Sequence, residues 1–311
     1  MTRSARFLVA VVLVPVLLPA VPAQAATPPP GHTDRTVVSG LNNPTAMAVA
    51  PDGRVFIAEQ GGAVRIVKNG ALLPNAFVNL TVDSSGERGA IGITLHPNFP
   101  SAPYLYVHYT VPGAHNRVSR FTISGDQFVG GSELPILDLP TLSGATNHNG
   151  GGIHFGLDGQ LYVGVGDNAN SALAQQIASP FGKILRITST GAVPGDNPFV
   201  GVGGADPRIY ALGFRNPFAF AVDPMTGVIY VNDVGSSGAG VREEINWLFG
   251  GANYGWPIVE GFSDDNRLVT PLHAYDHSDG SCAVTGGVFV DSRAWTGVSP
   301  GGRPPFPVFL R

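Results

Sequence analysis

The sequence predicts an all-β repeat protein of the β-propeller type. Two observations carry this prediction: a turn-then-strand phrase recurs along the chain, and turn-forming residues are unusually frequent. The 311 residues include 42 Gly and 27 Pro, yet 43% of the chain is hydrophobic. Such a composition indicates many turns between short strands and argues against disorder.

The recurring phrase places an Asp-Gly turn before an apolar strand. Pro51-Asp52-Gly53 precedes the segment 55–57, and Leu157-Asp158-Gly159 precedes 161–165. Asp-Gly beside alternating apolar residues is the strongest local hairpin signal. Looser copies begin near residues 96 and 223, so the repeating unit is 45 to 66 residues long.

Each unit also has an apolar strand before the turn and usually a third strand after it. We expect strands at 46–49, 63–67, 104–107, 184–187, 218–222 and 229–231. Repeats of this length made of short strands are typical of propeller blades. A sandwich is the alternative, but it does not explain the repeated turn phrase. Four units are clear and a fifth begins near Ser281; the best helical candidate, 171–178, lies in a loop.

The first 25 residues have the three-part pattern of a signal peptide. Arg3 and Arg6 are followed by an apolar run from Phe7 to Ala20 and by Ala23-Gln24-Ala25, a small-x-small cleavage site. The apolar run is shorter than the roughly 20 residues that span a bilayer. We therefore expect export, with residues 1–25 removed and no membrane span afterwards.

Charge and cysteine content exclude other classes. Only 13% of the residues are charged, with 18 Lys and Arg against 22 Asp and Glu, so no dense basic field is available for a nucleic acid. Cys282 is the single cysteine, which precludes an intramolecular disulfide and is unusual for an exported chain.

One loop carries a candidate general base. His148 lies between two asparagines and is followed by three glycines, which allow a ligand to approach the backbone closely. A neutral imidazole can accept a hydroxyl proton near neutral pH. The alternative is a histidine bonded into a turn. The strand 161–165 ends in Gly166-Asp167, where a carboxylate can orient the ring.

Two further loops carry charge beside apolar strands. Arg215 and Asn216 precede the strand 218–222, where a guanidinium can hold an anion bidentately or, alternatively, cap a loop. Acidic residues beside Gly-rich backbone follow, in the segments 233–236, 242–246 and 250–257. Carboxylates and carbonyls together suit calcium, although no Asp-x-Asp-x-Asp loop is present.

As an ordered set, these phrases resemble the glucose/sorbosone dehydrogenase family, the soluble aldose dehydrogenases that depend on pyrroloquinoline quinone (PQQ). The matching segments are 40–44, 86–92, 95–99, 147–151, 166–167, 214–217, 243–246 and 253–257, in family order. The resemblance implies a six-bladed propeller. No single phrase is decisive; the order is.

The resemblance also implies roles for individual residues. His148 is the base that takes the proton of the sugar's anomeric hydroxyl, Asp167 holds its ring, and Arg215 stabilises the negative charge that develops on the quinone. Asn216 and Glu87 contact the cofactor. The carbonyls of Gly235 and Ser236 match the positions where the family holds the calcium that anchors PQQ. Glu244 and the Tyr254 carbonyl resemble the ligands of a second calcium site.

Three departures from the family accompany these matches. Glu87 stands where well-studied members carry glutamine, and Ser236 replaces a proline. After the segment 281–287, the closing strands and the basic residue that contacts PQQ have no counterpart. Relatives with a cysteine at the position of Cys282 often pair it within that blade, and the last residues are rich in proline. The chain is therefore interpreted as a C-terminally shortened relative with an incomplete last blade.

The domain organisation follows: a signal peptide (1–25), a flexible segment (26–36), the propeller domain (37–294) and a Pro-rich irregular tail (295–311). The expected function is oxidation of an aldose to its lactone by an exported enzyme that uses PQQ, Ca²⁺ and a separate electron acceptor. One alternative is a non-catalytic propeller that binds carbohydrate or protein. The other, a calcium-dependent lactonase, would need several carboxylates around one ion.

Overall fold

Turns and short antiparallel strands make up nearly all of the structure. The computed structural model describes residues 35–113, 115–237, 240–278, 282–290 and 306–310. The predicted signal peptide and most of the Pro-rich tail lie outside these residues. The chain from Thr36 onward forms one structural unit, and the description below concerns that unit.

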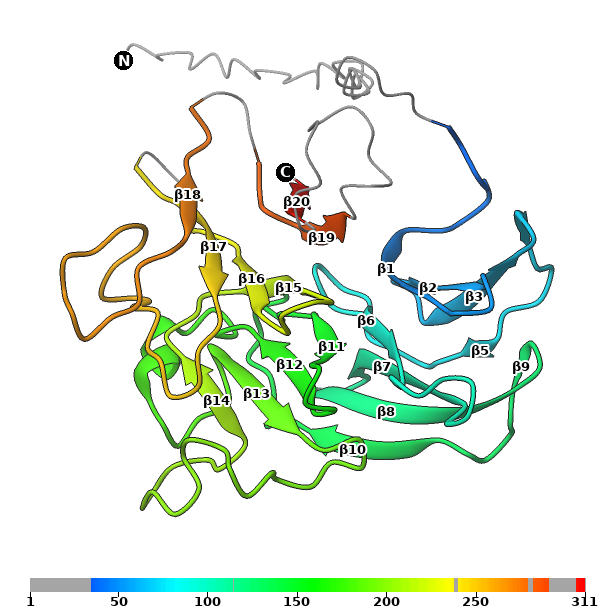
Figure 1. The fold of residues 1–311 in the computed structure, drawn as a ribbon, viewed down its shortest axis with the longest axis horizontal. Coiled ribbons are helices and arrows are strands. Elements are labelled where there is room, and N and C mark those ends of the chain that lie inside the picture. The colour runs from blue at the N-terminus through cyan, green and yellow to red at the C-terminus, as the bar shows by residue number, and fades with distance from the viewer. Residues whose placement is uncertain (1–34, 114, 238–239, 279–281, 291–305, 311) are drawn as a thin grey trace, which may run out of the picture. The chain divides into compact units, whose positions relative to one another are not determined.

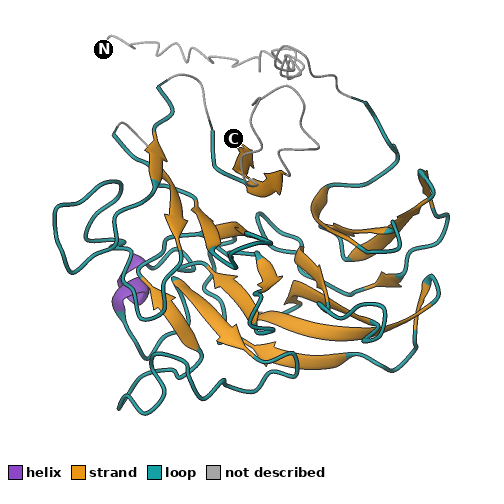
Figure 2. Ribbon diagram, viewed as in Figure 1, coloured by secondary structure: helices purple, strands orange, loops and turns teal. Residues whose placement is uncertain are grey.

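Four sheets follow one another in chain order, each an antiparallel meander (Figures 1 and 2). The first contains β1 (Pro44–Val49), β2 (Val55–Glu59), β3 (Ala63–Lys68), β4 (Ala71–Leu72) and β5 (Val78–Asn79). The second contains β6 (Ala90–Leu95), β7 (Tyr104–Val111), β8 (His115–Ser124), β9 (Gln127–Phe128) and β10 (Leu134–Asp138). The third contains β11 (Ile153–Phe155), β12 (Leu161–Val165), β13 (Lys183–Ile187) and β14 (Ile209–Leu212). The fourth contains β15 (Pro217–Val222), β16 (Ile229–Asp233), β17 (Glu243–Trp247) and β18 (His273–Tyr275).

The first strands of successive sheets lie beside one another. β1 contacts β6, β6 contacts β11, β11 contacts β15, and β15 contacts β19 (Gly286–Val290). Sheets that meet through their first strands are the blades of a propeller, whereas a sandwich packs two sheets face to face. The predicted all-β propeller fold is confirmed.

The predicted number of six blades is wrong for the described residues. Four complete blades occupy Pro44–Tyr275, and only the two-stranded pair of β19 and β20 (Phe306–Leu310) follows them. The repeated turn phrase indicated four clear units, and the number six came from the family resemblance. Because each blade uses 45 to 66 residues, the described chain supplies strands for four.

Two smaller expectations have different outcomes. The helical candidate at 171–178 is a single 3₁₀ turn, η1 (Ser171–Gln175), in the β12–β13 connection. The tail 295–311 was expected to be irregular, but Phe306–Leu310 pairs with β19. Its apolar sequence suits a strand, and Pro307 is tolerated because a two-stranded sheet consists of edge strands.

The hydrophobic core is divided into three clusters, one between each pair of neighbouring blades. Phe56 and Phe121 belong to the cluster between the first and second blades, and both are fully buried. Tyr106 and Leu185 represent the cluster between the second and third, and Phe214 the one between the third and fourth. Each blade therefore buries the apolar face predicted from its alternating pattern.

A register irregularity marks the start of three first strands. It lies between Pro44 and Ala46 in β1, between Ala90 and Gly92 in β6, and between Pro217 and Ala219 in β15. Such bulges bend a strand and re-aim the residues before it. In β1, Ala46 and Ala48 pack toward the second blade, whereas Met47 and Val49 on the opposite face are 70% and 67% exposed.

Strand direction decides which loops share one end of the blades. Because successive strands alternate in direction, the loop that enters a blade and the loop between its second and third strands lie at the same end.

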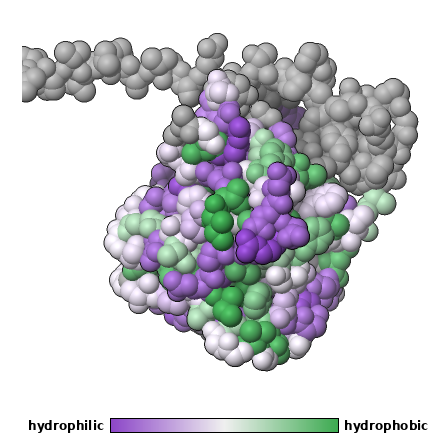
Figure 3. All heavy atoms as spheres, turned by 90° about the vertical axis from the view of Figure 1, so that its left-hand side faces the viewer, coloured by the Kyte–Doolittle hydropathy of each residue, from purple (hydrophilic) through white to green (hydrophobic). Residues whose placement is uncertain are grey.

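The long connection between β17 and β18 folds back along β14, where Asn253 bridges to Leu212. The face that carries this connection mixes hydrophilic and hydrophobic residues (Figure 3). Within the described residues, no helix has the length and apolar character needed to cross a membrane.

Candidate active site

The predicted site residues converge at this common end of the blades. Glu87, His148 and Arg215 with Asn216 lie in the loops that enter the second, third and fourth blades, respectively. Asp167 lies between the second and third strands of the third blade, and Gly235 with Ser236 occupies the matching loop of the fourth blade. Residues that are up to about 150 positions apart are therefore brought together by the blade repeat.

His148 and Asp167 form a direct pair. The Nδ1 atom of His148 lies 2.7 Å from Oδ1 of Asp167, and the carboxylate is 1% exposed. An ionised carboxylate can only accept, so Nδ1 carries the proton and donates it. The lone pair of Nε2 is then available to accept a proton from a ligand. The pairing expected from the sequence is present.

The backbone around His148 adopts an unusual conformation. Its φ is +56°, in the left-handed region that few residues other than glycine adopt. The Glu87 carboxylate accepts a hydrogen bond from the His148 N–H at 2.8 Å, and Asn168 N donates to the His148 carbonyl at 3.2 Å. A Cβ atom at Gly166 would come within 2.2 Å of the same carbonyl, so this position requires glycine.

Glu87 and Asn216 join the loops of three blades. Asn216 is 2% exposed; its Oδ1 accepts from Gly150 N at 2.9 Å, and its Nδ2 donates to Glu87 Oε2 at 3.3 Å. The same oxygen of Glu87 accepts from the His148 N–H. Both side chains were predicted to contact a cofactor, and the structure shows them holding the loop of the candidate base in place.

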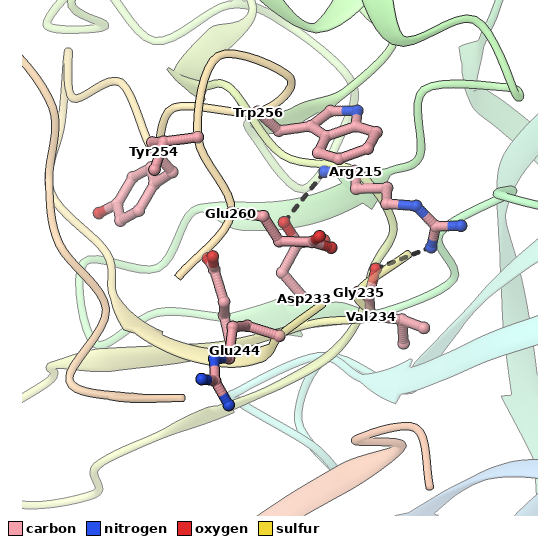
Figure 4. A pocket seen from close by; sticks show the side chains of 10 residues that line it. Arg215, Asp233, Val234, Gly235, Glu244, Tyr254, Trp256 and Glu260 are labelled. Atoms are coloured by element: carbon pink, nitrogen blue, oxygen red, sulfur yellow. Dashed lines mark hydrogen bonds between the residues drawn. The ribbon is translucent and has the colours of Figure 1, made fainter. Parts of the chain in front are cut away.

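Arg215 lies next to the His148–Asp167 pair. Its carbonyl accepts from Asp167 N at 2.8 Å, and its Nη1 donates to the carbonyl of Val234 at 2.9 Å. Its guanidinium carbon is 5.7 Å from the centre of the Trp256 ring. Figure 4 shows the two side chains next to each other. The side chain is partly exposed, so it can also meet a ligand.

Carboxylates surround a small cavity beneath Arg215. The cavity has a volume of about 10 Å³, and Asp233, Glu244 and Glu260 line it together with Gly235 (Figure 4). This volume suits one water molecule or one ion. Asp233 accepts from the backbone N–H groups of Arg215 (3.0 Å) and Asn216 (2.7 Å), which fixes the loop above the cavity.

Burial and neighbouring negative charges disfavour the ionised forms of Asp233 and Glu244 in this cavity. Burial, with Glu244 nearby, raises the pKa of Asp233 well above its usual range. Burial raises the pKa of Glu244 to about 7, and the charges of Glu260 and Glu243 contribute in the same direction. A bound cation would offset both causes, because it supplies the missing opposite charge.

The residues present fit calcium only if carbonyls take part. Among the described residues, no three acidic, histidine or cysteine side chains converge closely enough to hold an ion alone. Calcium accepts mixed carboxylate and carbonyl ligands, and Gly235 lines the cavity beside the acidic groups. The Tyr254 side chain packs in the core against Phe214, with ring centres 4.4 Å apart, so only its backbone is available to a metal.

Ser236 has a function that a proline cannot supply. Its backbone N–H and its hydroxyl both donate to the carboxylate of Glu260, and the Oγ–Oε2 distance is 2.7 Å. This pair fastens the Gly235-Ser236 segment to the β17–β18 connection.

Sequence reasoning gave no individual role to three residues of the site: Asp233, Glu260 and Trp256. Asp233 and Trp256 lie in the segments 233–236 and 250–257 that it singled out, and Asp233 ends a strand at the common end of the blades. Glu260 and Trp256 reach the site only because the β17–β18 connection folds back, and no local pattern indicates that path.

Comparison with known proteins agrees with this geometry. The family model described as glucose/sorbosone dehydrogenase matches residues 41–297. A putative oxidoreductase (glucose dehydrogenase) from Thermus thermophilus is 38% identical with a TM-score of 0.74, over 82% of this chain and 75% of that one. The PQQ-bound aldose sugar dehydrogenase from Streptomyces coelicolor is 29% identical with a TM-score of 0.71, over 82% and 73%.

A curated relative extends the comparison. Quinoprotein glucose dehydrogenase B of Acinetobacter calcoaceticus is 28% identical over 90% of this chain and 66% of its own length. The chain spans 60% to 66% of the first curated relatives that it matches. The family model covers most of the chain, and the protein belongs to the glucose/sorbosone dehydrogenase family.

Proposed function

We propose that this protein is a PQQ- and calcium-dependent oxidoreductase that oxidises an aldose at its anomeric carbon to the lactone. One observation carries the proposal: the buried His148–Asp167 pair lies beside a partly exposed Arg215 at the end of the blades where the site loops meet. The pair supplies a base, and the arginine supplies a positive charge. Oxidation of a hydroxyl carbon needs a base for the hydroxyl proton, and a positive charge can stabilise the acceptor that takes up the hydride.

The proton is removed by His148. With Nδ1–H donated to Asp167, Nε2 accepts the proton of the anomeric hydroxyl, and the imidazole becomes positively charged. The Asp167 carboxylate, 2.7 Å from Nδ1, stabilises that charge. The oxygen left without its proton then forms the lactone carbonyl as the hydrogen on the anomeric carbon leaves with its electron pair.

PQQ, when bound, supplies the acceptor for this hydride. The chain's contribution to that acceptor is Arg215, whose guanidinium can interact with an anionic oxygen. Trp256 and the Val234 carbonyl hold the guanidinium in place. Glu87 and Asn216 keep the His148 loop in position, and either can also contact the cofactor.

Calcium is assigned to the fourth blade. The carbonyls of Gly235 and Ser236 would hold the ion that anchors PQQ, and Glu244 with the Tyr254 carbonyl would hold a second ion. The raised pKa values of Asp233 and Glu244 support a cation in this region, since burial of carboxylates without a counter-charge is unfavourable. Export to an extracytoplasmic compartment, which residues 1–25 predict, belongs to the same proposal.

A reconstitution experiment tests the proposal. The purified mature protein is titrated with PQQ and calcium, and dye reduction is measured with a panel of aldoses. We expect saturable PQQ binding and sugar-dependent dye reduction. PQQ binding without turnover for any aldose would favour the alternative of a non-catalytic binding propeller.

Two histidine variants locate the base. His148→Gln should abolish turnover and leave PQQ binding largely intact. His115→Gln is the matched control, because His115 also pairs with an aspartate, Asp138, at 3.1 Å, but in an exposed position on β8. Unchanged turnover in His148→Gln would remove the role assigned to this residue.

A further inference from the structure

The indole of Trp256 contacts both halves of the proposed active site. Its Nε1–H donates to Oδ2 of Asp167 at 2.8 Å, and its ring faces the guanidinium of Arg215 at 5.7 Å. We propose that Trp256 is a positioning residue that fixes the Asp167 carboxylate and, through it, the ring orientation and tautomer of His148. The inference builds on the proposed role of His148 as the base.

The two oxygens of Asp167 have separate duties. Oδ1 accepts from His148 Nδ1 at 2.7 Å and from Ala169 N at 2.8 Å, and Oδ2 accepts from Trp256. The terminal torsion of an aspartate is intrinsically broad, so contacts at one oxygen leave the carboxylate plane poorly defined. A donor at the second oxygen defines it. Because Asp167 is 1% exposed, bulk water cannot readily replace that donor.

The chemistry of indole makes this contact one-directional. An indole nitrogen only donates, and an ionised carboxylate only accepts. The Asp167 carboxylate therefore acts as an acceptor on both oxygens, with a hydrogen-bond donor on each side. With Asp167 held as an acceptor, His148 must present Nδ1–H to it, and Nε2 stays free of a proton. Trp256 thus favours, through Asp167, the tautomer of His148 that the base requires.

The placement of Trp256 is itself secured by the fold. Gln175 Nε2 donates to the Trp256 carbonyl at 2.7 Å, and Trp256 N donates to the Gly213 carbonyl at 3.0 Å. Gln175 and Asn253 also exchange a pair of side-chain hydrogen bonds, 3.0 and 2.8 Å long. The β17–β18 connection is in this way tied to η1 and to the loop that carries Arg215.

A phenylalanine at position 256 separates the two contacts. Trp256→Phe keeps an aromatic ring beside Arg215 and removes only the N–H that bonds Asp167. The matched control is Trp247→Phe, because Trp247 on β17 is 42% exposed and its ring contacts Tyr230 and Phe249, outside the site.

The first readout uses the protein without cofactor. Proton and nitrogen NMR of histidine-labelled protein reports the Nδ1–H of His148, identified by its loss in His148→Gln. We expect wild type and Trp247→Phe to show one slowly exchanging Nδ1–H. In Trp256→Phe that proton should exchange at least about tenfold faster, or the two tautomers should both be populated.

The second readout is kinetic. Groups that orient metal-ligating histidines through a hydrogen bond typically contribute about 10- to 100-fold to metal affinity or activity, and we take the same range for the orientation of His148. We expect Trp256→Phe to lower kcat by that factor, with the KM for the aldose changed less than about threefold. A purely structural role would lower the melting temperature and leave the His148 signal of the folded fraction unchanged.

The outcomes are distinguishable. An unchanged Nδ1–H signal in folded Trp256→Phe overturns the inference, whatever the activity. If the signal changes in Trp256→Phe but the wild type oxidises no aldose, the inference is supported. The missing turnover then counts only against the proposed function. If Trp256→Phe does not fold, 3-benzothienylalanine at position 256 replaces the N–H by sulfur with the same ring shape, and the same two results decide.

Discussion

Replacement of Asp167 by asparagine tests the charge that the structure places behind His148. The carboxylate accepts three hydrogen bonds: two at Oδ1, from His148 and Ala169, and one at Oδ2, from Trp256. An amide has one oxygen and one NH₂ group, so its NH₂ must face either the His148 side or the indole. In the first orientation His148 can pair with it only as the tautomer protonated at Nε2, which cannot act as the base.

The second orientation keeps the correct tautomer but loses the charge. When His148 takes a proton, the carboxylate attracts the imidazolium with charge centres roughly 4 Å apart, an interaction of about 4 kcal/mol at an effective dielectric constant near 20. Since each 1.4 kcal/mol is a factor of ten in rate, Asp167→Asn should lower kcat about 1,000-fold. The PQQ affinity should change little, because Asp167 contacts protein groups on both oxygens.

The assay is dye-linked aldose oxidation after reconstitution with PQQ and calcium, with PQQ binding measured separately. Asp138→Asn is the control, since Asp138 pairs with His115 at 3.1 Å and its side chain is 49% exposed. That variant should keep full activity. A kcat for Asp167→Asn within about threefold of wild type would refute the electrostatic role of Asp167.

Three further predictions concern stability. Chelation of calcium should lower the melting temperature, because an ion at 100 times its dissociation constant stabilises the native state by about 2.7 kcal/mol, and Asp233→Asn should reduce the calcium-dependent shift seen by calorimetry. Burial lowers the pKa of Lys183 from 10.5 to about 7. Between pH 7 and pH 10.5 the unfolded chain therefore binds more protons at this side chain than the folded protein does. The free energy of unfolding should decrease as the pH falls through this range. Urea unfolding should therefore show that the free energy of unfolding of the wild type, relative to that of Lys183→Met, increases from pH 7 to pH 10 by at most about 1.4 kcal/mol per pH unit. A difference that stays constant with pH would contradict this. Gly213→Ala should lower the free energy of unfolding by about 2–5 kcal/mol, because φ is +82° and the new Cβ would lie 2.2 Å from Asn253 Oδ1. Gly53→Ala is the control: its φ is +86° and no atom lies within 4 Å of the new Cβ, so only the backbone strain of about 1–2 kcal/mol should be lost.

Lys183 also illustrates a buried ionisable group that the sequence did not reveal. Its side chain is fully buried, and its Nζ lies within hydrogen-bond distance of the carbonyls of Leu173 (2.8 Å), Ala174 (2.9 Å) and Phe181 (2.7 Å). Three acceptors suit the three protons of the ammonium form, which these carbonyls favour, whereas burial disfavours that form and lowers the pKa. In the sequence, Lys183 is only a polar residue at the start of an apolar strand.

The sequence by itself predicted the strands of the blades and the pairing of His148 with Asp167. Asp-Gly turns and alternating apolar residues are local signals, so strands such as Leu161–Val165 could be located without tertiary information. Spacing made a pairing of His148 with Asp167, at the end of the following strand, plausible, and the family resemblance implied that the carboxylate holds the imidazole ring. The family could be recognised because its phrases keep their order along the chain.

Only the tertiary structure decided how these loops are held together. Glu87 and Asn216 bond across three blades, and Trp256 and Glu260 reach the site through a connection that folds back along β14. These features depend on contacts between residues far apart in the sequence, and the positions of such contacts are set by packing between blades, for which no local pattern in the sequence gives a rule.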